Sequence, residues 1–470
     1  MKKVFKKISI LSLIFIFCCF SSCSTVTNTD VFEQPEKSET EKNSNSFSDK
    51  ISTLPDYDFG GKSFRIATDS HELIMPSGSA GIVNQSLYLR NAAVEKKYNV
   101  KLVLTEESSL PTITERIKTE ALAGSDYCDM IILESTKFQT LSAANLLLNI
   151  RSIPYLNINS EYYDETSLEA TTFGNMTYGV CGDFTLKPAE IFAVFFNKAL
   201  LNKTSLISPY QLVQDNQWDF ELFLQYAEEV YSLGKVNGVK TIGYTSTLNQ
   251  EKLINLFWAA SGERFLRNDY GSPPEVIFNT EYTDSIISVL QNKLFRSIAY
   301  MDDDKNATNR FLSQEALFCI APLENCKDFT GYGVDWGILP IPKFDINQEN
   351  YYSYMENSYS LVGFSIGTPD EIMSGMVGAA LFASSEHLSQ EINTALYLNY
   401  YLNAPEDAEM LKIIMENPYY DPVEFFGQGN TAYTAVTQTL LFRTISGEDD
   451  FDQLYRQYII MFEKYLEENF

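Results

Sequence analysis

Met130-Ile131-Ile132-Leu133 is a run of four apolar residues with no polar residue between them. Strands that are covered on both faces, as in a parallel sheet, have this pattern, whereas half-exposed strands alternate. Two more strands are predicted before it, at 63–67 and 100–104, and the apolar spacing of 84–98 and 113–121 predicts helices between them. The order strand, helix, strand, helix, strand predicts an α/β fold.

Polar residues follow the first and third of these strands. Thr68 and Asp69 come directly after 63–67, and Glu134 and Ser135 come directly after Leu133. In open parallel sheets, ligands bind beyond the carboxyl ends of the strands. We therefore expect these four residues to contact a ligand.

A second α/β lobe is predicted after a crossing of the chain. The apolar run 191–197 is followed by Lys198 and a helical pattern, and further buried strands are predicted at 317–320 and 336–340. The stretch 57–470 is long enough for two domains of ordinary size. The sequence shows no internal repeat.

Residues 1–22 have the pattern of an export signal. Four lysines precede the uncharged apolar run 8–20, and Ser21-Ser22 supplies the small residues of a cleavage site. The apolar run is shorter than the roughly 20 residues that a membrane-spanning helix needs, so a lone transmembrane helix is the weaker interpretation.

Residues 23–56 are predicted to form a flexible tether. Of the 32 residues from 24 to 55, 14 are Ser, Thr or Asn, and the apolar side chains among them are scattered. Such a segment buries too little apolar surface to offset its ordering entropy. A coil of this length has an r.m.s. span of about 30 Å.

The charge balance of the chain is strongly acidic. Cleavage before Cys23 would remove four lysines and no acid, which leaves 31 basic and 62 acidic side chains. Phosphate binding needs a basic face, so the composition argues against a nucleic-acid partner. It also argues against adhesion of the protein body to anionic lipid.

Four cysteines remain beyond Cys23, at positions 128, 181, 319 and 326. An exported chain can oxidise them, and four cysteines allow three complete pairings. A chain of this size does not depend on disulfides for its core, so we treat these cysteines first as buried apolar residues. The chain has only two histidines and neither a C-x-x-C nor an H-E-x-x-H motif, so no metal site or cofactor is expected.

Gly363-Phe364-Ser365-Ile366-Gly367 matches G-x-S-x-G, the nucleophile elbow of α/β-hydrolases. In that elbow a helix begins directly behind the serine. Here Thr368 as the cap, Pro369 as the first helical residue and Glu371 predict a helix start four residues after Ser365. An extracellular hydrolase with Ser365 as its nucleophile is therefore the less favoured alternative.

Several segments carry a family resemblance by their order along the chain. They are Phe20-Ser21-Ser22-Cys23, Asp58-Phe59-Gly60-Gly61-Lys62, residues 89–100, Ala123-Gly124-Ser125-Asp126, Phe195-Phe196-Asn197-Lys198 and residues 337–343. The first resembles a bacterial lipobox, with Phe20 where that motif usually has Leu. Together they resemble the extracellular solute-binding proteins of bacterial ABC importers, most closely the carbohydrate-binding type that is called family 1-like.

The resemblance implies the two-lobed α/β fold of periplasmic binding proteins, with a hinge and a ligand cleft between the lobes. It places lobe I at 57–183 and 365–404, lobe II at 187–360 and 405–470, and the hinge at 183–186 and 361–365. Gly363 and Gly367 are then expected to be points where the backbone bends.

In that family the cleft holds a sugar. A pyranose offers apolar C–H faces and a rim of hydroxyls, so it favours aromatic plates and carboxylate acceptors. With 3 Trp and 29 Tyr in the chain, some of the plates would be tyrosines. The candidate plates are Tyr162, Tyr163, Trp258 and Trp336, and the candidate acceptors are Asp69, Glu134, Asp183 and Glu324.

The resemblance also implies a function. Cys23 would carry a lipid anchor on the extracellular face of the cytoplasmic membrane, and a monomer would close around a sugar and deliver it to the ABC permease subunits. No catalysis is expected. The alternatives are a plain secretory cleavage in place of the lipid anchor, the hydrolase named above, and a peptide-binding or adhesive surface lipoprotein.

Overall fold

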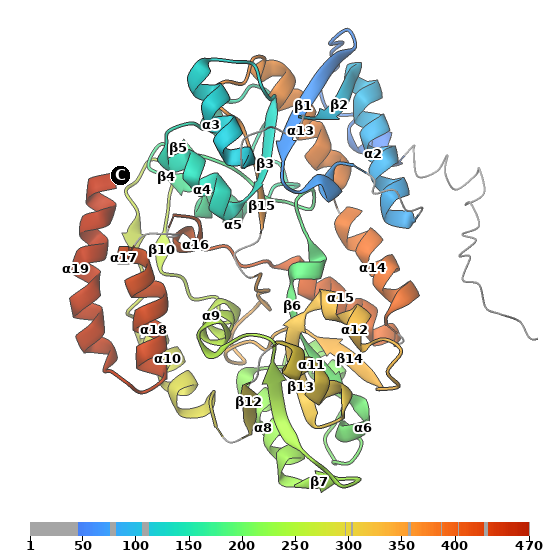
Figure 1. Cartoon of the computed structure of the whole chain (residues 1–470), viewed down its shortest axis with the longest axis vertical. Coiled ribbons are helices and arrows are strands. Elements are labelled where there is room, and N and C mark those ends of the chain that lie inside the picture. The colour runs from blue at the N-terminus through green and yellow to red at the C-terminus, as the bar shows by residue number, and fades with distance from the viewer. Residues whose placement is uncertain are drawn as a thin grey trace, which may run out of the picture. The chain divides into compact units, whose positions relative to one another are not determined.

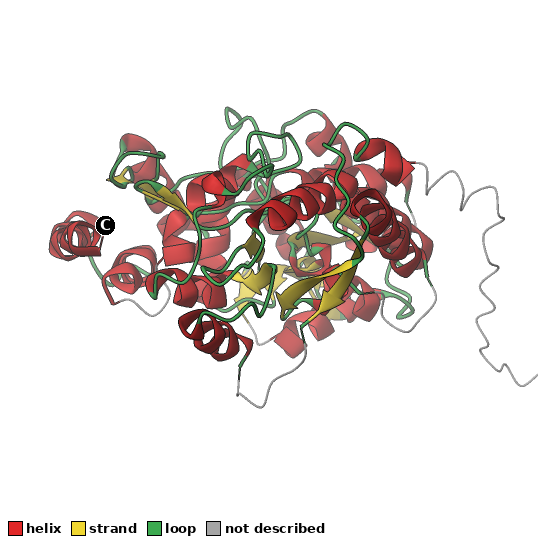
Figure 2. Ribbon diagram, turned by 90° about the horizontal axis from the view of Figure 1, so that it is seen from above, coloured by secondary structure: helices red, strands yellow, loops and turns green. Residues whose placement is uncertain are grey.

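The computed structural model describes residues 46–75, 81–105, 112–296, 298–301, 304–355, 359–386, 388–402, 404–426 and 431–469. Two separate larger sheets organise these residues. The first lies in the upper part of Figure 1 and the second in the lower part, and Figure 2 shows helices around the strands.

The first sheet has the strand order β15-β3-β1-β2. It consists of β1 (Lys62–Thr68), β2 (Val100–Leu104), β3 (Met130–Glu134) and β15 (Ser360–Gly363). β1 is parallel to β2 and β3, whereas β15 is antiparallel to β3. Met130 and Ile132 of β3 face one hydrophobic core, and Ile131 and Leu133 face another. The prediction that this strand is covered on both faces is confirmed.

Helices surround this first sheet and form lobe I with it. The main helices of this lobe contact the strands of the sheet or one another. They are α2 (Ile82–Tyr98), α3 (Ile113–Ala123), α4 (Ser135–Ala143) and α13 (Glu371–Ser385). The short helices η1 (His71–Leu73), η2 (Ile150–Ser152) and α5 (Glu165–Ala170) and the hairpin of β4 (Thr172–Phe173) and β5 (Met176–Thr177) belong to the same part of the chain. α14 (Leu388–Tyr400) contacts both α2 and α15 (Pro405–Glu416).

The second sheet has the order β12-β9-β13-β6-β14. It consists of β6 (Phe192–Asn197), β9 (Ile242–Ser246), β12 (Ala299–Met301), β13 (Ala316–Pro322) and β14 (Trp336–Leu339). β9 is parallel to β12 and β13, and β6 is antiparallel to β13 and β14. The sheet and its helices form lobe II, so the prediction of an α/β chain with two sheets is confirmed.

The helices of lobe II lie in two stretches of the chain, residues 198–329 and the residues from 405 onward. They are α6 (Lys198–Leu201), α7 (Pro209–Gln214), α8 (Phe220–Ser232), α9 (Gln250–Ala260), α10 (Glu281–Lys293), α11 (Asp304–Leu312), α12 (Cys326–Phe329) and α15. The C-terminal helices are α16 (Pro422–Phe426), α17 (Thr431–Thr434), the π-helix η5 (Ala435–Leu440), α18 (Leu441–Ile445) and α19 (Phe451–Asn469). Short hairpins are formed by β7 (Lys235–Val236) with β8 (Val239–Lys240) and by β10 (Leu266–Arg267) with β11 (Glu275–Val276).

Three chain segments pass between the lobes, and they pair with one another. Residues 181–191 connect lobe I to β6, residues 340–355 follow β14 toward β15, and residues 417–420 follow α15. Isolated bridges join Val180 to Val362 and Ile191 to Met355. A third bridge joins Ser353 to Pro418, with the Tyr419 amide donating to the Ser353 carbonyl at 2.8 Å. We call these three stretches the crossing segments.

Two of the predicted boundaries are wrong. Residues 361–365 were predicted as hinge, but Ser360–Gly363 form β15, so the second crossing lies before Ser360. Gly363 is a packing position, because a Cβ there would meet the Phe138 ring and lie 2.8 Å from the Tyr178 carbonyl. The predicted tether extends too far, since Phe47 and Ile51 are buried. Residues 1–45, with the predicted signal and Cys23, lie outside the described residues.

α16 also departs from the predicted division, which assigned 405–470 to lobe II. It packs against α4 and α5 of lobe I, with the Phe425 ring centroid 6.2 Å from that of Phe138. Close by, Arg264 of lobe II forms a 2.6 Å ion pair with Glu169 of lobe I. The lobes therefore touch at a second place besides the crossing segments.

The remaining chemical expectations concern Ser365 and the cysteines. Ser365 is buried, and its Oγ accepts a hydrogen bond from the Gly367 amide at 3.2 Å, so the serine belongs to a turn. α13 is capped by Asp370, whose side chain accepts from the Met373 amide, and not by Thr368 as predicted. The cysteines at 128, 181, 319 and 326 are buried in the hydrophobic cores, as expected of small apolar residues. No helix in the described ranges is long and apolar enough to span a bilayer.

We expect opposite effects from two glycine substitutions one turn apart in α13. A Cβ at Gly375 would collide with the Pro154 carbonyl, whereas a Cβ at Gly378 would have its nearest neighbours at 3.5 Å. Gly375→Ala should lower the free energy of unfolding by about 1–3 kcal/mol through overpacking. Gly378→Ala should raise it by about 1 kcal/mol through helix propensity. Urea unfolding of both variants measures this, and equal effects would contradict the packing of α13 on residues 153–154.

Candidate functional site

The carboxyl ends of β1 and β3 bring the four predicted edge residues together. Asp69 and Glu134 both pair with Lys137, at 2.7 Å and 3.0 Å. Burial alone would lower the pKa of Lys137, but the hydrogen bonds that its Nζ donates to Asp69 and Glu134 raise that pKa overall. Thr68 is buried and accepts a hydrogen bond from the Ser70 amide, and the Ser135 amide donates to the Tyr359 carbonyl. The two carboxylates therefore share one lysine, which the sequence prediction missed.

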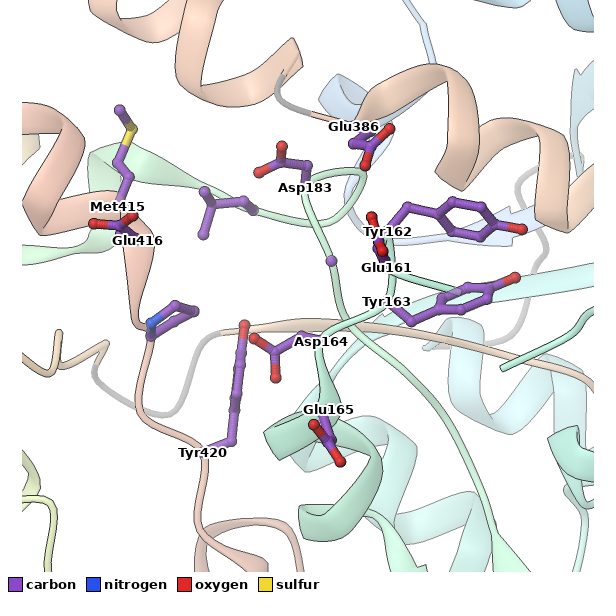
Figure 3. A pocket seen from close by; sticks show the side chains of 13 residues that line it. Glu161, Tyr162, Tyr163, Asp164, Glu165, Asp183, Glu386, Met415, Glu416 and Tyr420 are labelled. Atoms are coloured by element: carbon purple, nitrogen blue, oxygen red, sulfur yellow. The ribbon is translucent and has the colours of Figure 1, made fainter. Parts of the chain in front are cut away.

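A cavity of about 270 Å³ lies at the crossing segments (Figure 3). Lobe I contributes residues 161–165, Gly182 and Glu386 to its wall, and the end of α15 contributes Met415 and Glu416. The crossing segments themselves contribute Asp183, Leu186, Pro418 and Tyr420. We call this the crossing cavity. It contains three of the predicted ligand-binding residues, namely Tyr162, Tyr163 and Asp183.

The charge of the crossing cavity is one-sided. Six of its lining residues carry carboxyl groups, and no described lining residue is Lys, Arg or His. The six are Glu161, Asp164, Glu165, Asp183, Glu386 and Glu416. Carboxylates are strong hydrogen-bond acceptors, so the wall suits groups that donate, such as hydroxyls. The same wall repels anions.

Asp164 is the most constrained of these acids. Its side chain caps α5 by accepting hydrogen bonds from the Ser167 amide and the Thr166 hydroxyl, both at 2.7 Å. Burial raises the pKa of Asp164, and these hydrogen bonds oppose the rise. Both hydrogen bonds are accepted by Oδ1, so they fix the Asp164 carboxylate at the start of α5 and hold it in the cavity wall.

The two predicted tyrosine plates lie side by side and point away from Met415 and Glu416 (Figure 3). Their ring centroids are 4.6 Å apart. Tyr163 packs on Phe382 at 4.7 Å, and its hydroxyl donates to the Leu156 carbonyl. Tyr162 is half-buried beside it, so of the two only Tyr162 retains an accessible ring edge.

The two predicted tryptophan plates lie in the core of lobe II. Trp258 is 2% exposed and stacks on Phe265, with centroids 4.7 Å apart. Trp336 is 6% exposed and packs against Phe195 and Phe329. Contrary to the prediction, neither tryptophan lines the crossing cavity. Both stand in apolar runs of the sequence, where an aromatic residue serves a core as readily as a site.

Glu324 and Asp183 remain from the predicted acceptors. Glu324 lies in η4 (Leu323–Asn325), which contacts η3 (Pro188–Glu190) of the first crossing segment. It pairs with Lys327 at 3.2 Å and is largely exposed. Asp183 lines the crossing cavity from the first crossing segment. Of these two predicted acceptors, Asp183 lines the crossing cavity and Glu324 does not.

Tyr420 and Asp421 are functional candidates that the sequence prediction missed. Tyr420 lines the cavity and packs edge-on against Tyr359 at 4.9 Å. The buried Asp421 carboxylate accepts hydrogen bonds from the Phe265 amide, the Val423 amide and the Tyr419 hydroxyl. It thereby fixes the turn from the third crossing segment into α16. No periodicity or motif marks these residues, because their partners are distant in sequence.

Comparison with known families decides what kind of protein has this arrangement. A family model described as bacterial extracellular solute-binding protein matches residues 91–418. The chain belongs to this family. Its members are described as binding proteins outside the cell, which is the coarse role predicted from the resemblance. A comparison with curated protein sequences gave no match.

Solved structures similar to this chain share its fold at low sequence identity. A cyclo/maltodextrin-binding protein complexed with maltotetraose has a TM-score of 0.55 and 12% identity, covering 86% of this chain and 97% of that one. An ABC substrate-binding protein from Listeria monocytogenes in complex with cycloalternan has a TM-score of 0.51 and 13% identity, covering 87% and 99%.

A third similar structure is a maltose-binding periplasmic protein from Listeria monocytogenes in complex with maltose, with a TM-score of 0.54 and 15% identity, covering 87% and 99%. The predicted fold, a two-lobed α/β fold like that of periplasmic binding proteins, is therefore confirmed.

We expect Asp421→Asn to change the pH dependence of stability. Burial raises the pKa of Asp421 from 3.8 to about 6, so its contribution to folding is fully present below pH 3.8 and is lost as pH rises through 6. Between these pH values the wild-type contribution should fall by about 3 kcal/mol. Urea unfolding from about pH 4 to about pH 7 should give a smaller fall in Asp421→Asn. Parallel pH profiles for the two proteins would contradict the raised pKa.

Proposed function

We propose that this protein is the substrate-binding component of a bacterial ABC importer and that it captures a neutral sugar or oligosaccharide outside the cell. The observation that carries the proposal is the crossing cavity, whose wall combines residues of lobe I, of α15 and of the crossing segments. Family membership and the fold support binding as the role.

The chemistry of the wall supports a neutral, hydroxyl-rich ligand. Hydroxyl groups can donate to the carboxylates of Asp183, Glu386 and Glu416, and hydrogen bonds to a charged acceptor are about twice as strong as neutral ones. A sugar acid or sugar phosphate would instead meet like charge without a described basic side chain to offset it. The similar proteins that were solved with maltotetraose, cycloalternan and maltose support the same ligand class.

Capture would work by rotation of the lobes about the crossing segments. A ligand that contacts Asp183 on one side and Glu416 on the other binds best when these residues are close, so it stabilises one lobe arrangement over others. That arrangement is what membrane permease subunits would recognise. Release would follow when the permease favours the opposite arrangement.

Attachment to the membrane is the remaining part of the proposal. A diacylated Cys23 would tether the protein at the extracellular face of the cytoplasmic membrane through residues 24–45. A tether of this length keeps the binding lobes within a few nanometres of a permease and so raises their effective concentration there.

We expect Asp183→Asn to weaken sugar binding. The loss of one charge-assisted hydrogen bond of about 1.5–3 kcal/mol corresponds to roughly a tenfold to hundredfold weaker affinity. Calorimetric titration with maltose, maltotetraose and cycloalternan measures this. Glu275→Gln, which removes an exposed acid of β11 outside the cavity, is the matched control and should bind as wild type.

The same titrations contain the outcomes that contradict the proposal. Equal binding by Asp183→Asn and wild type would remove the crossing cavity from sugar recognition. Tighter binding of galacturonate oligomers than of neutral ones would contradict the charge argument. Binding of peptides with no response to any saccharide would support a peptide-binding lipoprotein instead.

Cys23→Ser should release the protein from the membrane if Cys23 carries the anchor. We expect wild-type protein in the membrane fraction, with a lipid-sized mass increment on its N-terminal peptide, and Cys23→Ser in the soluble fraction. Fractionation with mass spectrometry measures both. A wild-type protein that is soluble and begins at an unmodified residue would show plain secretory cleavage.

A further inference from the structure

A second cavity, of about 260 Å³, lies between α2, α14 and the first crossing segment. Its wall is mostly aliphatic and includes Leu87 of α2, Leu388 and Ile392 of α14, and Leu186 and Pro188 of the crossing segment. Asp183 and Leu186 border both cavities, so this cavity adjoins the crossing cavity but has its own wall. We call it the α2–α14 cavity.

A buried cation stands in this apolar wall. Arg90 lines the cavity and is 2% exposed. Its Nη2 donates to the Leu73 carbonyl at 2.7 Å, and its Nε and Nη2 donate to the Asn91 Oδ1. Among the described residues, the hydrogen bond of its Nη1 is a long one of 3.4 Å to the Ser385 Oγ. All these acceptors are neutral.

The guanidinium of Arg90 lies over the Phe184 ring, 5.0 Å from its centroid, which offsets part of the cost of burying the charge. Within the described residues, no carboxylate forms an ion pair with Arg90. Burial lowers the pKa of its guanidinium to about 9, so the group is still charged at neutral pH. A buried cation without an anionic partner is costly, and its Nη1 is the least satisfied of its donors. A ligand anion in the cavity would supply a negative charge next to Arg90 and a hydrogen-bond acceptor for its Nη1.

The shape and polarity of the wall limit the ligand class further. The aliphatic side chains call for a hydrocarbon part, and the volume suits a short chain or a single ring. Lys187 at the wall is already paired with Glu72 at 3.6 Å and Glu190 at 3.7 Å. These two acids and Asp183, which borders the same cavity, would repel a phosphate dianion more strongly than a monoanion, which favours a carboxylate.

We propose that the α2–α14 cavity binds a small amphipathic monocarboxylate, with its carboxylate on the Nη1 of Arg90 and its hydrocarbon part against Leu87, Leu388 and Ile392. This site is separate from the sugar site of the proposed function and does not depend on it. Because Phe184 to Glu190 of the first crossing segment form part of its wall, an occupant would contact the segment about which the lobes rotate.

The proposal is tested with octanoate as the probe and octanol as its uncharged counterpart, by calorimetric titration and thermal shift of the full folded chain. We expect octanoate to bind at least tenfold more tightly than octanol. Leu87→Trp fills the cavity while keeping Arg90 and its charge in the chain, and it should abolish octanoate binding. Leu122→Trp, on the exposed face of α3, is the matched control and should bind octanoate as wild type.

Arg90→Met removes the charge and should equalise the affinities for octanoate and octanol. Arg90 also donates a hydrogen bond to the Leu73 carbonyl, so this variant can fail to fold. In that case the proposal is tested by octanoate binding to Leu87→Trp and by the comparison of octanoate with octanol in the wild type. Octanoate binding that Leu87→Trp leaves intact, equal binding of octanoate and octanol by wild type, or no octanoate binding at millimolar concentration would each overturn the proposal. Maltotetraose titration of Leu87→Trp reports the sugar site separately.

Discussion

The pairing of the three crossing segments is the constraint on which the rest of the structure depends. Each lobe has its own sheet, and the segments between them run as neighbours, with bridges at Ile191–Met355 and Ser353–Pro418. Backbone hydrogen bonds such as those from the Phe192 amide to the Tyr354 carbonyl and from the Tyr419 amide to the Ser353 carbonyl hold the segments together. In the proposed capture by lobe rotation, these paired segments are the part of the chain about which the lobes would move.

This pairing also explains why two cavities lie at the same place. Residues of the first crossing segment line both the acid-lined crossing cavity and the α2–α14 cavity, and Asp183 borders both. The segment turns at residues 182–185 and forms η3 at Pro188–Glu190, so its side chains face more than one direction. One short stretch of chain therefore contributes residues to both cavity walls.

The sequence predicted the elements better than the site. Local patterns such as the unbroken apolar run of β3 depend on neighbours along the chain, and the prediction of its burial is confirmed. Trp258 was misjudged because a core ring and a ligand-binding ring look alike in sequence. Gly363 was predicted to be a point where the backbone bends, whereas in the structure its missing side chain makes room for the Phe138 ring. Tyr420 and Asp421 escaped prediction because their partners are brought near only by the crossing of the chain.

The positions of the carboxyl groups around the crossing cavity indicate which class of ligand fits it. Within the described part of the chain, no group of three or more His, Cys, Asp or Glu side chains converges in a way that would hold a metal ion. The six carboxyl groups are instead spread over lobe I, the crossing segments and α15. Spread acceptors fit a ligand whose donors are also spread, as the hydroxyls of a sugar are, better than a compact cation. The like charge of this wall also disfavours an anionic ligand in the crossing cavity itself.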